Sequence, residues 1–429
     1  MKHFFKKIIV AILCFEANIL LSRQKPKIIA VTGSVGKTTT KDAIYTVLKD
    51  HIHTRKSQKS FNSEIGVPLS VLGLENGWNN PVLWLKNIID GAVVALFTKD
   101  YPAVLVLEMG VDRPGDMKQM TSWIAPDITV LTRFPDVPVH VEYFHTPQAV
   151  VTEKMTLVHA LKPDGVVIYN HDDVVIRAAL QDLDAKVIGF SNTSPSQFVA
   201  SDNEYVYSDG KPAGITFNIT HINTVERVTL QGSLGEPQLY TVAAAIAVGS
   251  QFGITVQEAV TALAAQVPSP GRLRLVAGKS DSTIIDDSYN SSPVAVEKSL
   301  DTLQALNCDG RKIAILGDML ELGQYSVREH ERVGEQVARV VDVLVTIGLR
   351  SAKTAATALK AGMPNKCVQQ FEDTESALAA LIDFAKPGDI ILVKASQGIR
   401  AEKVVKLLMK QPAEAAQLLV RQSPMWDKR

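Results

Sequence analysis

Residues 27–40 read Lys27-Ile28-Ile29-Ala30-Val31-Thr32-Gly33-Ser34-Val35-Gly36-Lys37-Thr38-Thr39-Thr40, and the fold prediction starts from this stretch. The β-branched run up to Val31 is typical of a buried strand, and the residues after Lys37 have the apolar spacing of a helix. A glycine loop between a strand and a helix directs backbone N–H groups and a helix N-terminus at an anion. We therefore predict a nucleotide phosphate loop, with an ordinary strand-to-helix turn as the alternative.

The residues of this loop have separate predicted roles. The ε-ammonium of Lys37 would reach the terminal phosphates, and the Thr38 hydroxyl would ligate Mg²⁺. The general phosphate-loop pattern has glycine six residues before the lysine, where this chain has Val31, so the loop is a shorter subtype. The predicted nucleotide-binding residues of the loop are Gly33, Ser34, Val35, Gly36, Lys37, Thr38 and Thr39.

Length and composition limit the class of protein. A chain of 429 residues should hold two or three domains. Lys plus Arg and Asp plus Glu both number 45, so no basic surplus indicates a nucleic-acid partner. Cys14, Cys308 and Cys367 form no Cys-x-x-Cys pair. We therefore expect reduced cytoplasmic thiols and neither a disulfide framework nor a zinc ribbon.

The first 25 residues form a separate apolar segment, basic from Met1 to Lys7 and largely apolar from Ile8 to Leu21. Fourteen apolar residues are too few to span a bilayer. A helix packed on the protein, a membrane-surface anchor through residues 1–22 and a signal peptide are the three interpretations. The segment has no small-residue cleavage site, which argues against a signal peptide. An apolar helical stripe is predicted at Phe4, Phe5, Ile8, Ile12 and Phe15.

Two α/β domains are predicted from the alternation of strand-like and helical stretches. Residues 26–270 would form a central ATP-binding domain with a phosphate loop and a parallel sheet, and residues 271–429 a second, Rossmann-like domain. The Pro- and Gly-rich stretch 268–271 between them is typical of a hinge. The expected strands are 28–32, 103–108, 128–132, 166–170 and 187–190, then 282–287, 312–316, 343–347 and 390–394. The expected helices are 37–49, 81–97, 114–124, 147–161, two within 238–265, 293–306, 326–340, 351–361 and 373–385. Residues 197–233 alternate like an antiparallel ribbon, and a short helix and a polar tail should follow Gln411.

Further candidate site residues follow the first strands. Glu108 ends a strand, so its carboxylate should point into the same crevice as Lys37 and join Thr38 as a Mg²⁺ ligand, unless it is merely exposed. His140 lies in a loop, and Lys154 follows fourteen residues later on a predicted helix. Each is a weak signal alone, but together with Glu108 they indicate a second metal site.

Six motifs occur in an order that resembles the Mur ligases over residues 26 to about 410. They are Thr-Gly-x-x-Gly-Lys-Thr-Thr, Ser-Phe-Asn62-Ser-Glu-Ile-Gly, Leu-Glu108-Met-Gly, His140-x-Glu with Lys154, Asp-Asp-Ser-Tyr-Asn at 286–290 and Gly-Asp-Met-Leu-Glu-Leu-Gly at 317–323. The resemblance implies that Lys154 is carbamate-modified and bridges the second Mg²⁺, with His140 as a ligand, so that Lys37, Lys154 and His140 are catalytic. It also implies that Asn62, Arg272, Asp287 and Tyr289 contact ATP, and that residues 394–400 lie near the amine substrate.

The chain departs from the family pattern at three places. The family carries a sugar-nucleotide domain before the phosphate loop, whereas about 30 residues precede it here. Pro237, Gln238 and Thr241 stand where the family has its adenine-pocket residues, so base recognition should differ. Ala395 and Gln397 replace a glycine and an arginine near the amine site.

The resemblance implies an ATP-dependent, ADP-forming carboxylate–amine ligase that works through an acyl phosphate in peptidoglycan precursor synthesis. The acceptor would be a nucleotide-linked peptide carboxylate, a UDP-N-acetylmuramoyl-tripeptide, and the amine D-alanyl-D-alanine. ATP and Mg²⁺ would be required, and a cytoplasmic monomer is expected. Another Mur-fold amino-acid ligase, such as one that extends poly-γ-glutamate, and a non-catalytic nucleotide-binding relative are the alternatives.

Overall fold

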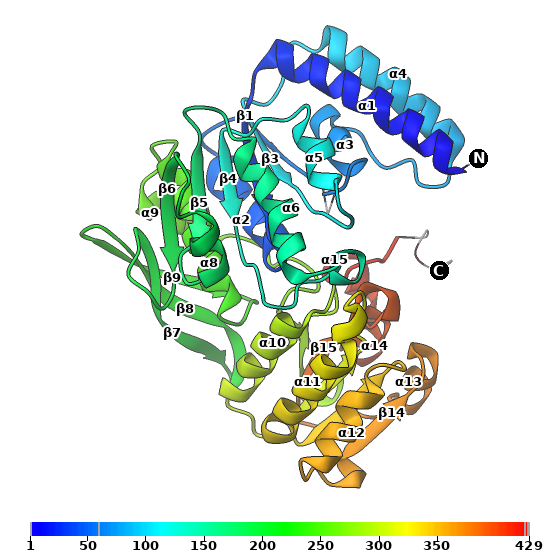
Figure 1. Cartoon of the computed structure of the whole chain (residues 1–429). Coiled ribbons are helices and arrows are strands. Elements are labelled where there is room, and N and C mark those ends of the chain that lie inside the picture. The colour runs from blue at the N-terminus through cyan, green and yellow to red at the C-terminus, as the bar shows by residue number, and fades with distance from the viewer. Residues whose placement is uncertain (1, 59–60, 424–425, 427–429) are drawn as a thin grey trace.

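The computed structural model describes residues 2–58, 61–423 and 426, and two sheets organise it (Figure 1). The first seven strands of the first sheet, β1 to β7, are parallel, and β8 and β9 extend the sheet antiparallel. In spatial order the strands are β2 (Thr54–Lys56), β3 (Val104–Glu108), β1 (Lys27–Thr32), β4 (Ile128–Leu131), β5 (Val166–Asn170), β6 (Lys186–Ser191), β7 (Phe198–Ser208), β8 (Lys211–His221) and β9 (Thr224–Gln231). The predicted ribbon is confirmed as β7–β9, and it continues the parallel sheet because Phe190 pairs with Phe198.

The second sheet lies after the predicted hinge and is parallel except for its first edge strand. Its order is β10 (Arg274–Ala277), β11 (Thr283–Asp286), β15 (Ile390–Lys394), β12 (Lys312–Gly317), β13 (Val343–Ile347) and β14 (Val368–Phe371). The α/β class with two successive sheets is thereby confirmed. The domain limits at 25/26 and 270/271 stay predictions.

Helices cover both faces of the first sheet, because successive strand side chains point to opposite sides. Ile29 and Val31 pack toward one layer of helices, and Ile28 and Ala30 toward the other. The first layer is α2 (Lys37–Leu48), α8 (Pro237–Ser250) and α9 (Val256–Ala264). The second is α3 (Gly66–Leu72), α5 (Asp116–Thr121), α6 (Pro147–His159) and α7 (Val174–Ala179), with α1 (Lys2–Gln24) and α4 (Pro81–Phe97) outside α3.

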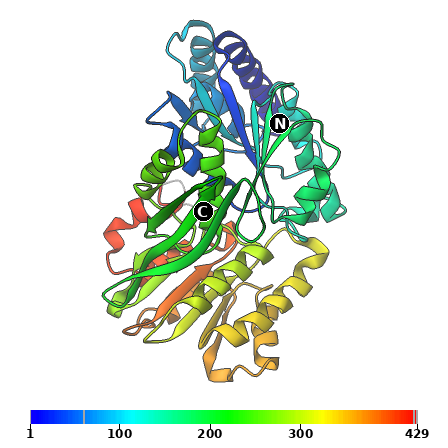
Figure 2. The same ribbon diagram turned by 90° about the vertical axis from the view of Figure 1, so that its left-hand side faces the viewer.

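The second sheet is also covered on both faces, and Figure 2 shows its helices at the end of the molecule opposite α1 and α4. One layer is α10 (Pro293–Ala305), α11 (Ser326–Val340) and α12 (Ala352–Lys360). The other is α13 (Thr374–Ala380), α14 (Glu402–Leu408) and α15 (Ala415–Leu418).

Several local predictions were wrong in extent. Helix α5 begins two residues late, because Gly115 is left-handed (φ 93°) and the Asp116 carboxylate accepts from the N–H groups of Asp112 and Arg113. Helix α13 ends at Ala380, before the predicted residue 385. The strands β2, β10 and β14 and the helices α3, α7 and α14 were not predicted, because three to seven residues are too few for a clear period.

The N-terminal segment is a helix packed on the protein, but its buried face is not the predicted one. Val10, Leu13, Ala17 and Leu20 of α1 are buried in the core with α3 and β3. Phe5, Ile8 and Phe15 of the predicted stripe are exposed, and the side chain of Phe4 lies outside the described residues. No helix in the described part of the chain is long and apolar enough to cross a membrane.

Glu16 lies on the buried side of α1, facing α4. Its side chain is 6% exposed, and its Oε2 has no hydrogen-bond partner among the described residues. Gly91 of α4 makes room for it, since a Cβ there would stand 2.1 Å from Oε2. Burial raises the pKa of Glu16 from 4.5 to about 7. The folded state therefore favours the neutral acid.

Glu16→Gln should stabilise the protein at pH 8 and change little at pH 5. Because the folded pKa is raised, the folded state holds the extra proton between pH 4.5 and 7, and stability falls as pH rises through that window. The variant removes the buried charge, so its Tm at pH 8 should exceed the wild-type value by roughly 2–4 °C. Thermal unfolding at pH 5, 6.5 and 8 measures this. Glu75→Gln, which replaces an exposed acid before α4, is the control. If the Tm difference between Glu16→Gln and the wild type is the same at all three pH values, the raised pKa of Glu16 is contradicted.

Candidate active site

The phosphate loop lies at the carboxyl end of β1, between the ends of β3 and β4. Gly33 has φ 144°, and a Cβ there would stand 2.0 Å from Oγ1 of Thr132, so only glycine fits against the end of β4. Gly36 is left-handed (φ 85°) and immediately precedes α2. The N-terminus of α2 is therefore open toward the edge of the sheet where ligands of α/β proteins bind.

Two lysines converge on one oxygen of this loop. The Gly33 carbonyl accepts hydrogen bonds from Lys37 Nζ at 2.9 Å and from Lys154 Nζ at 3.1 Å. Burial, together with the adjacent Lys37 ammonium, lowers the pKa of Lys154 well below its ordinary value. Lys154 is 2% exposed on α6. The sequence indicated that both lysines face one site, but not that they share an oxygen.

Arg272 adds a third cation at the same place. Burial lowers the pKa of Lys37, and the Arg272 guanidinium lowers it further against the opposite effect of Glu108. Arg272 stacks on the Tyr289 ring at 4.1 Å from the ring centroid, and its buried Nε has no hydrogen-bond partner in the part of the chain that the structure describes. Three cationic side chains around a helix N-terminus suit a polyanion such as a triphosphate.

Glu108 is held from both sides at the end of β3. Its side chain is 1% exposed, and its Oε1 accepts a hydrogen bond from Asn62 Nδ2 at 3.0 Å. Asn62, predicted to contact ATP, thus lies where it orients this carboxylate. Oε2 of Glu108 has no hydrogen-bond partner among the described residues and lies 3.9 Å from Lys41 Nζ. A buried carboxylate oxygen without a hydrogen bond, in the same cavity as Thr38, fits a hard cation such as Mg²⁺.

His140 lies beside two acidic residues, Asp112 of its own unit and Glu321 of the other. Its Nδ1 lies 2.6 Å from Glu321 Oε2, which follows β12 in the second α/β unit, and its Nε2 lies 3.5 Å from Asp112 Oδ1. The close contact with the His140 imidazole lowers the pKa of Glu321, against the opposite effect of burial. No group of three or more His, Cys, Asp or Glu side chains that could hold a metal forms among the described residues. The second metal site at His140 and Lys154 therefore stays a prediction.

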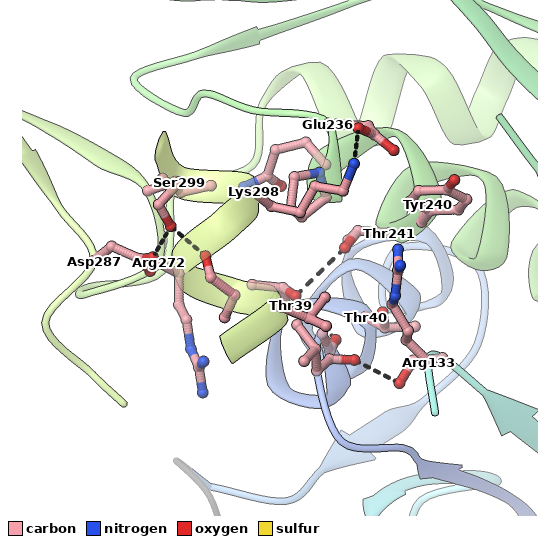
Figure 3. A pocket seen from close by; sticks show the side chains of 18 of the residues that line it. Thr39, Thr40, Arg133, Glu236, Tyr240, Thr241, Arg272, Asp287, Lys298 and Ser299 are labelled. Carbon is pink, nitrogen blue, oxygen red and sulfur yellow. Dashed lines mark hydrogen bonds and ion pairs between the residues drawn. The ribbon is translucent and has the colours of Figure 1, made fainter. Parts of the chain in front are cut away.

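A first cavity of about 850 Å³ separates the two α/β units, and Figure 3 shows its side chains. The N-terminal part of α2 supplies Thr39 and Thr40, and β4 is followed by Arg133. From the other side, Lys298 of α10 pairs with Glu236 at the start of α8 at 2.8 Å. The lining from both units, with cationic and hydroxyl side chains, fits a nucleotide.

Asp287 has partners of its own beside this cavity. Its Oδ2 accepts hydrogen bonds from Lys394 Nζ at 2.6 Å and from Ser299 Oγ at 2.7 Å. Lys394, at the end of β15, is 2% exposed, and burial lowers its pKa. Lys394, predicted near the amine, ties β15 to the end of β11. Tyr289 lines the second cavity described below and not the first.

The three residues that stand where the family has its adenine-pocket residues line the first cavity. Pro237 begins α8, and Gln238 and Thr241 are buried along it, with Thr241 Oγ1 3.4 Å from Thr39 Oγ1. Arg133, Asn170, Phe190 and Tyr240 are among the lining residues that the sequence did not predict. Asn170 ends β5, so the strand-end rule that found Glu108 also applies to it.

A second, larger cavity of about 1870 Å³ opens beyond the loop. Lys37, Thr38, Asn62, Glu108, His140 and Lys154 line it from the first unit. Ser396, Gln397 and Arg400 line it from the second unit, where the amine substrate was predicted. The two cavities share Val35, Gly36, Arg272 and Ala295. The phosphate loop therefore lies at their junction.

Comparison with known families decides the relationship. Residues 31–83 and 86–249 match the Mur ligase middle domain, and residues 271–397 match the Mur ligase glutamate ligase domain. The chain belongs to the Mur ligase family. It is accordingly an ATP-dependent, ADP-forming ligase, with the loop, Glu108 and Arg272 inside the matched regions.

Individual relatives of this Mur ligase agree with the assignment. The UDP-N-acetylmuramoyl-tripeptide–D-alanyl-D-alanine ligase of Bacillus subtilis is 29% identical over 397 residues, covering 92% of this chain and 79% of that one. The ligase of the same name from Mycobacterium leprae is 30% identical, with 87% and 71% covered. The crystal structure of the MurF ligase from Thermotoga maritima in complex with ADP has a TM-score of 0.75 and 25% identity, covering 94% of this chain and 84% of that chain.

Proposed function

We propose that this Mur ligase joins D-alanyl-D-alanine to the peptide carboxylate of a UDP-N-acetylmuramoyl-tripeptide in peptidoglycan precursor synthesis. Relatives at 29–30% identity that carry this name support the choice of substrates. The use of ATP would place the reaction in the cytoplasm.

The junction of the two cavities is the observation that supports a ligase reaction best. A nucleotide in the first cavity would extend its terminal phosphate past Gly36 and Arg272 into the second. The second cavity is bounded by residues of both α/β units, so an acceptor and an amine would meet the phosphate there. An ordinary nucleotide-binding module has no need of a second cavity at the phosphate end.

The chemistry would proceed in two steps. A carboxylate oxygen of the acceptor attacks the γ-phosphorus, the bond to the β-γ bridging oxygen breaks, and ADP leaves. The amine nitrogen then attacks the carbonyl carbon of the acyl phosphate, and inorganic phosphate leaves with the amine losing a proton. Lys37 and Arg272 would stabilise the charge on the transferred phosphoryl group. Mg²⁺ held by Thr38 and Glu108 would neutralise phosphate charge when bound.

Contacts between the two α/β units would protect the acyl phosphate from water. Glu321 reaches His140, and Lys298 reaches Glu236, so polar pairs lie on both sides of the junction. Excluding water from a reactive intermediate is a common consequence of domain closure.

Phosphate release from ATP should require the UDP-N-acetylmuramoyl-tripeptide and D-alanyl-D-alanine together. The test uses the full chain with Mg²⁺, each substrate omitted in turn, and glutamate in place of the dipeptide as the control amine. Equal or faster turnover with glutamate would support the poly-γ-glutamate alternative. ATP binding without turnover for any pair of substrates would support the non-catalytic alternative and contradict the proposal.

A further inference from the structure

Exposed large hydrophobic side chains are concentrated on α1 and α4, which lie at the end of the molecule away from the second sheet (Figures 1 and 2). Ten of the eighteen large hydrophobic side chains that are exposed among the described residues lie on these two helices. They account for 23 and 17 of the 429 residues. Single exposed hydrophobic residues are normal, but such a concentration marks a contact surface.

Helix α4 has one face for the protein and the opposite face for another contact. Asn87, Gly91 and Ala95 are its buried residues. Val82, Leu85, Ile89, Val93 and Leu96 follow each other at three- and four-residue steps and are 52–71% exposed. This spacing places them on a single stripe of the helix.

Helix α1 continues this surface. Glu16 touches Gly91, and the Arg23 guanidinium donates to the Ala95 carbonyl oxygen, so the two helices run side by side in the same direction. Phe15, next to Glu16 on the helix surface, is 66% exposed, and Phe5 and Ile8 are 60% and 41% exposed on the same stripe. We call the exposed stripes of α1 and α4 together the outer platform.

The charge around the outer platform is positive. Helix α1 contains four Lys or Arg residues and one acid, whereas the whole chain has 45 of each sign. The single acid is Glu16, which is buried under the platform. Lys7 is exposed, and Lys6, whose side chain is 53% exposed, pairs with Glu64 at 2.7 Å. On α4, Lys86 and Asp90 pair with each other and cancel.

We propose that the outer platform docks this ligase on the surface of an anionic lipid bilayer. Helices with an apolar face, aromatic side chains and basic flanks lie in the interface with their apolar face buried about 5–10 Å deep. Basic residues beside it are attracted by acidic headgroups. A symmetric contact between two copies would place like charges together, so a bilayer fits the charge better.

Docking through this end leaves the reaction site accessible. The phosphate loop and both cavities lie between the two α/β units, whereas α1 and α4 lie at the end of the molecule away from the second sheet and the exposed stripe of α4 is opposite its buried residues. Ligation in solution should therefore not depend on the platform, and the docking proposal stands independently of the identity of the substrates.

Vesicle flotation tests the proposal with the full chain. Binding to phosphatidylcholine vesicles with 30% phosphatidylglycerol should exceed binding to pure phosphatidylcholine vesicles at least tenfold. The double variant Ile89→Glu with Val93→Glu, and separately Phe15→Glu, should lower anionic-vesicle binding at least tenfold. Lys7→Gln should lower it about fivefold, which corresponds to about 1 kcal/mol for one basic side chain. Val327→Glu, at a position of α11 that is 52% exposed, is the matched control and should bind as the wild type.

Three results would overturn the proposal. The first is equal binding of the platform variants and the wild type, and the second is equal binding to neutral and anionic vesicles. The third is a dimer in light scattering that the platform variants abolish, without any binding to vesicles. The last would identify a second copy as the occupant. The unfolding temperature of each variant should stay within 2 °C of the wild-type value, which separates lost docking from misfolding. Its ligation rate in vesicle-free buffer should stay within twofold of wild type, which separates lost docking from an error in the proposed function.

Discussion

Lys37→Ala is expected to lower the rate of ligation by about 10³-fold or more. The variant removes the cation that the loop directs at the transferred phosphoryl group, and one preorganised charge at such a position accounts for factors of 10²–10³ or more. The fold should persist, because Lys37 donates only to the Gly33 carbonyl, which Lys154 also reaches. Steady-state phosphate release and thermal unfolding together measure both expectations.

Lys37→Ala should also raise the pKa of Lys154, because burial and the Lys37 ammonium are the two causes that lower it. Lys49→Ala, at the exposed C-terminal end of α2, is the matched control and should keep wild-type turnover. Near-wild-type phosphate release by Lys37→Ala in the presence of all substrates would show that the loop assignment is wrong.

Lys154→Ala is expected to reduce turnover at least 10²-fold while changing ATP affinity less than about threefold. Its depressed pKa makes a neutral amine available near neutral pH, and a neutral amine adds to CO₂ with loss of a proton to give a carbamate. A carbamate would convert a cation that repels Mg²⁺ into a hard anionic ligand. Short-chain carboxylates should restore part of the activity of the variant.

Bicarbonate labelled with ¹³C tests the carbamate directly. The wild type should show a carbamate resonance that Lys154→Ala lacks, and activity in CO₂-depleted buffer should fall and recover when bicarbonate is added. Lys118→Ala, at an exposed lysine of the adjacent helix α5, should retain both the resonance and the activity. Full activity of the wild type without a carbamate signal at saturating bicarbonate would contradict the modification.

Sequence reasoning located the parts of the site that depend on local order. A strand, a glycine loop and a helix must follow each other at residues 27–48, so the loop and Lys37 were predictable from their own neighbourhood. Glu108 was predictable because the carboxyl ends of parallel strands meet at one edge. Lys154 and His140 are weak signals alone and were singled out together with Glu108, and the family resemblance then implied their roles.

The contacts of those side chains required the tertiary structure. His140 meets Glu321, which is 181 residues further along the chain, and Asp287 meets Lys394 across a parallel strand pair. Such partners follow from how two units pack, and no spacing in the sequence encodes them. The short strands β2, β10 and β14 were missed for a similar reason, because pairing with a neighbour rather than their own pattern makes them strands.

The N-terminal helix separates the two kinds of information most clearly. From the sequence, a helix packed on the protein was one of three interpretations, with a single apolar stripe that includes Phe5, Ile8 and Phe15. The face of this helix that is buried depended on its packing against α3 and α4. Gly91 of α4 leaves room for Glu16, and Val10, Leu13 and Leu20 are then turned inward. The sequence thus determined the periodicity of each element and the chemistry of the phosphate loop. Only packing between distant segments decided which apolar face is covered and which faces outward, because burial is a property of neighbours that the local pattern does not contain.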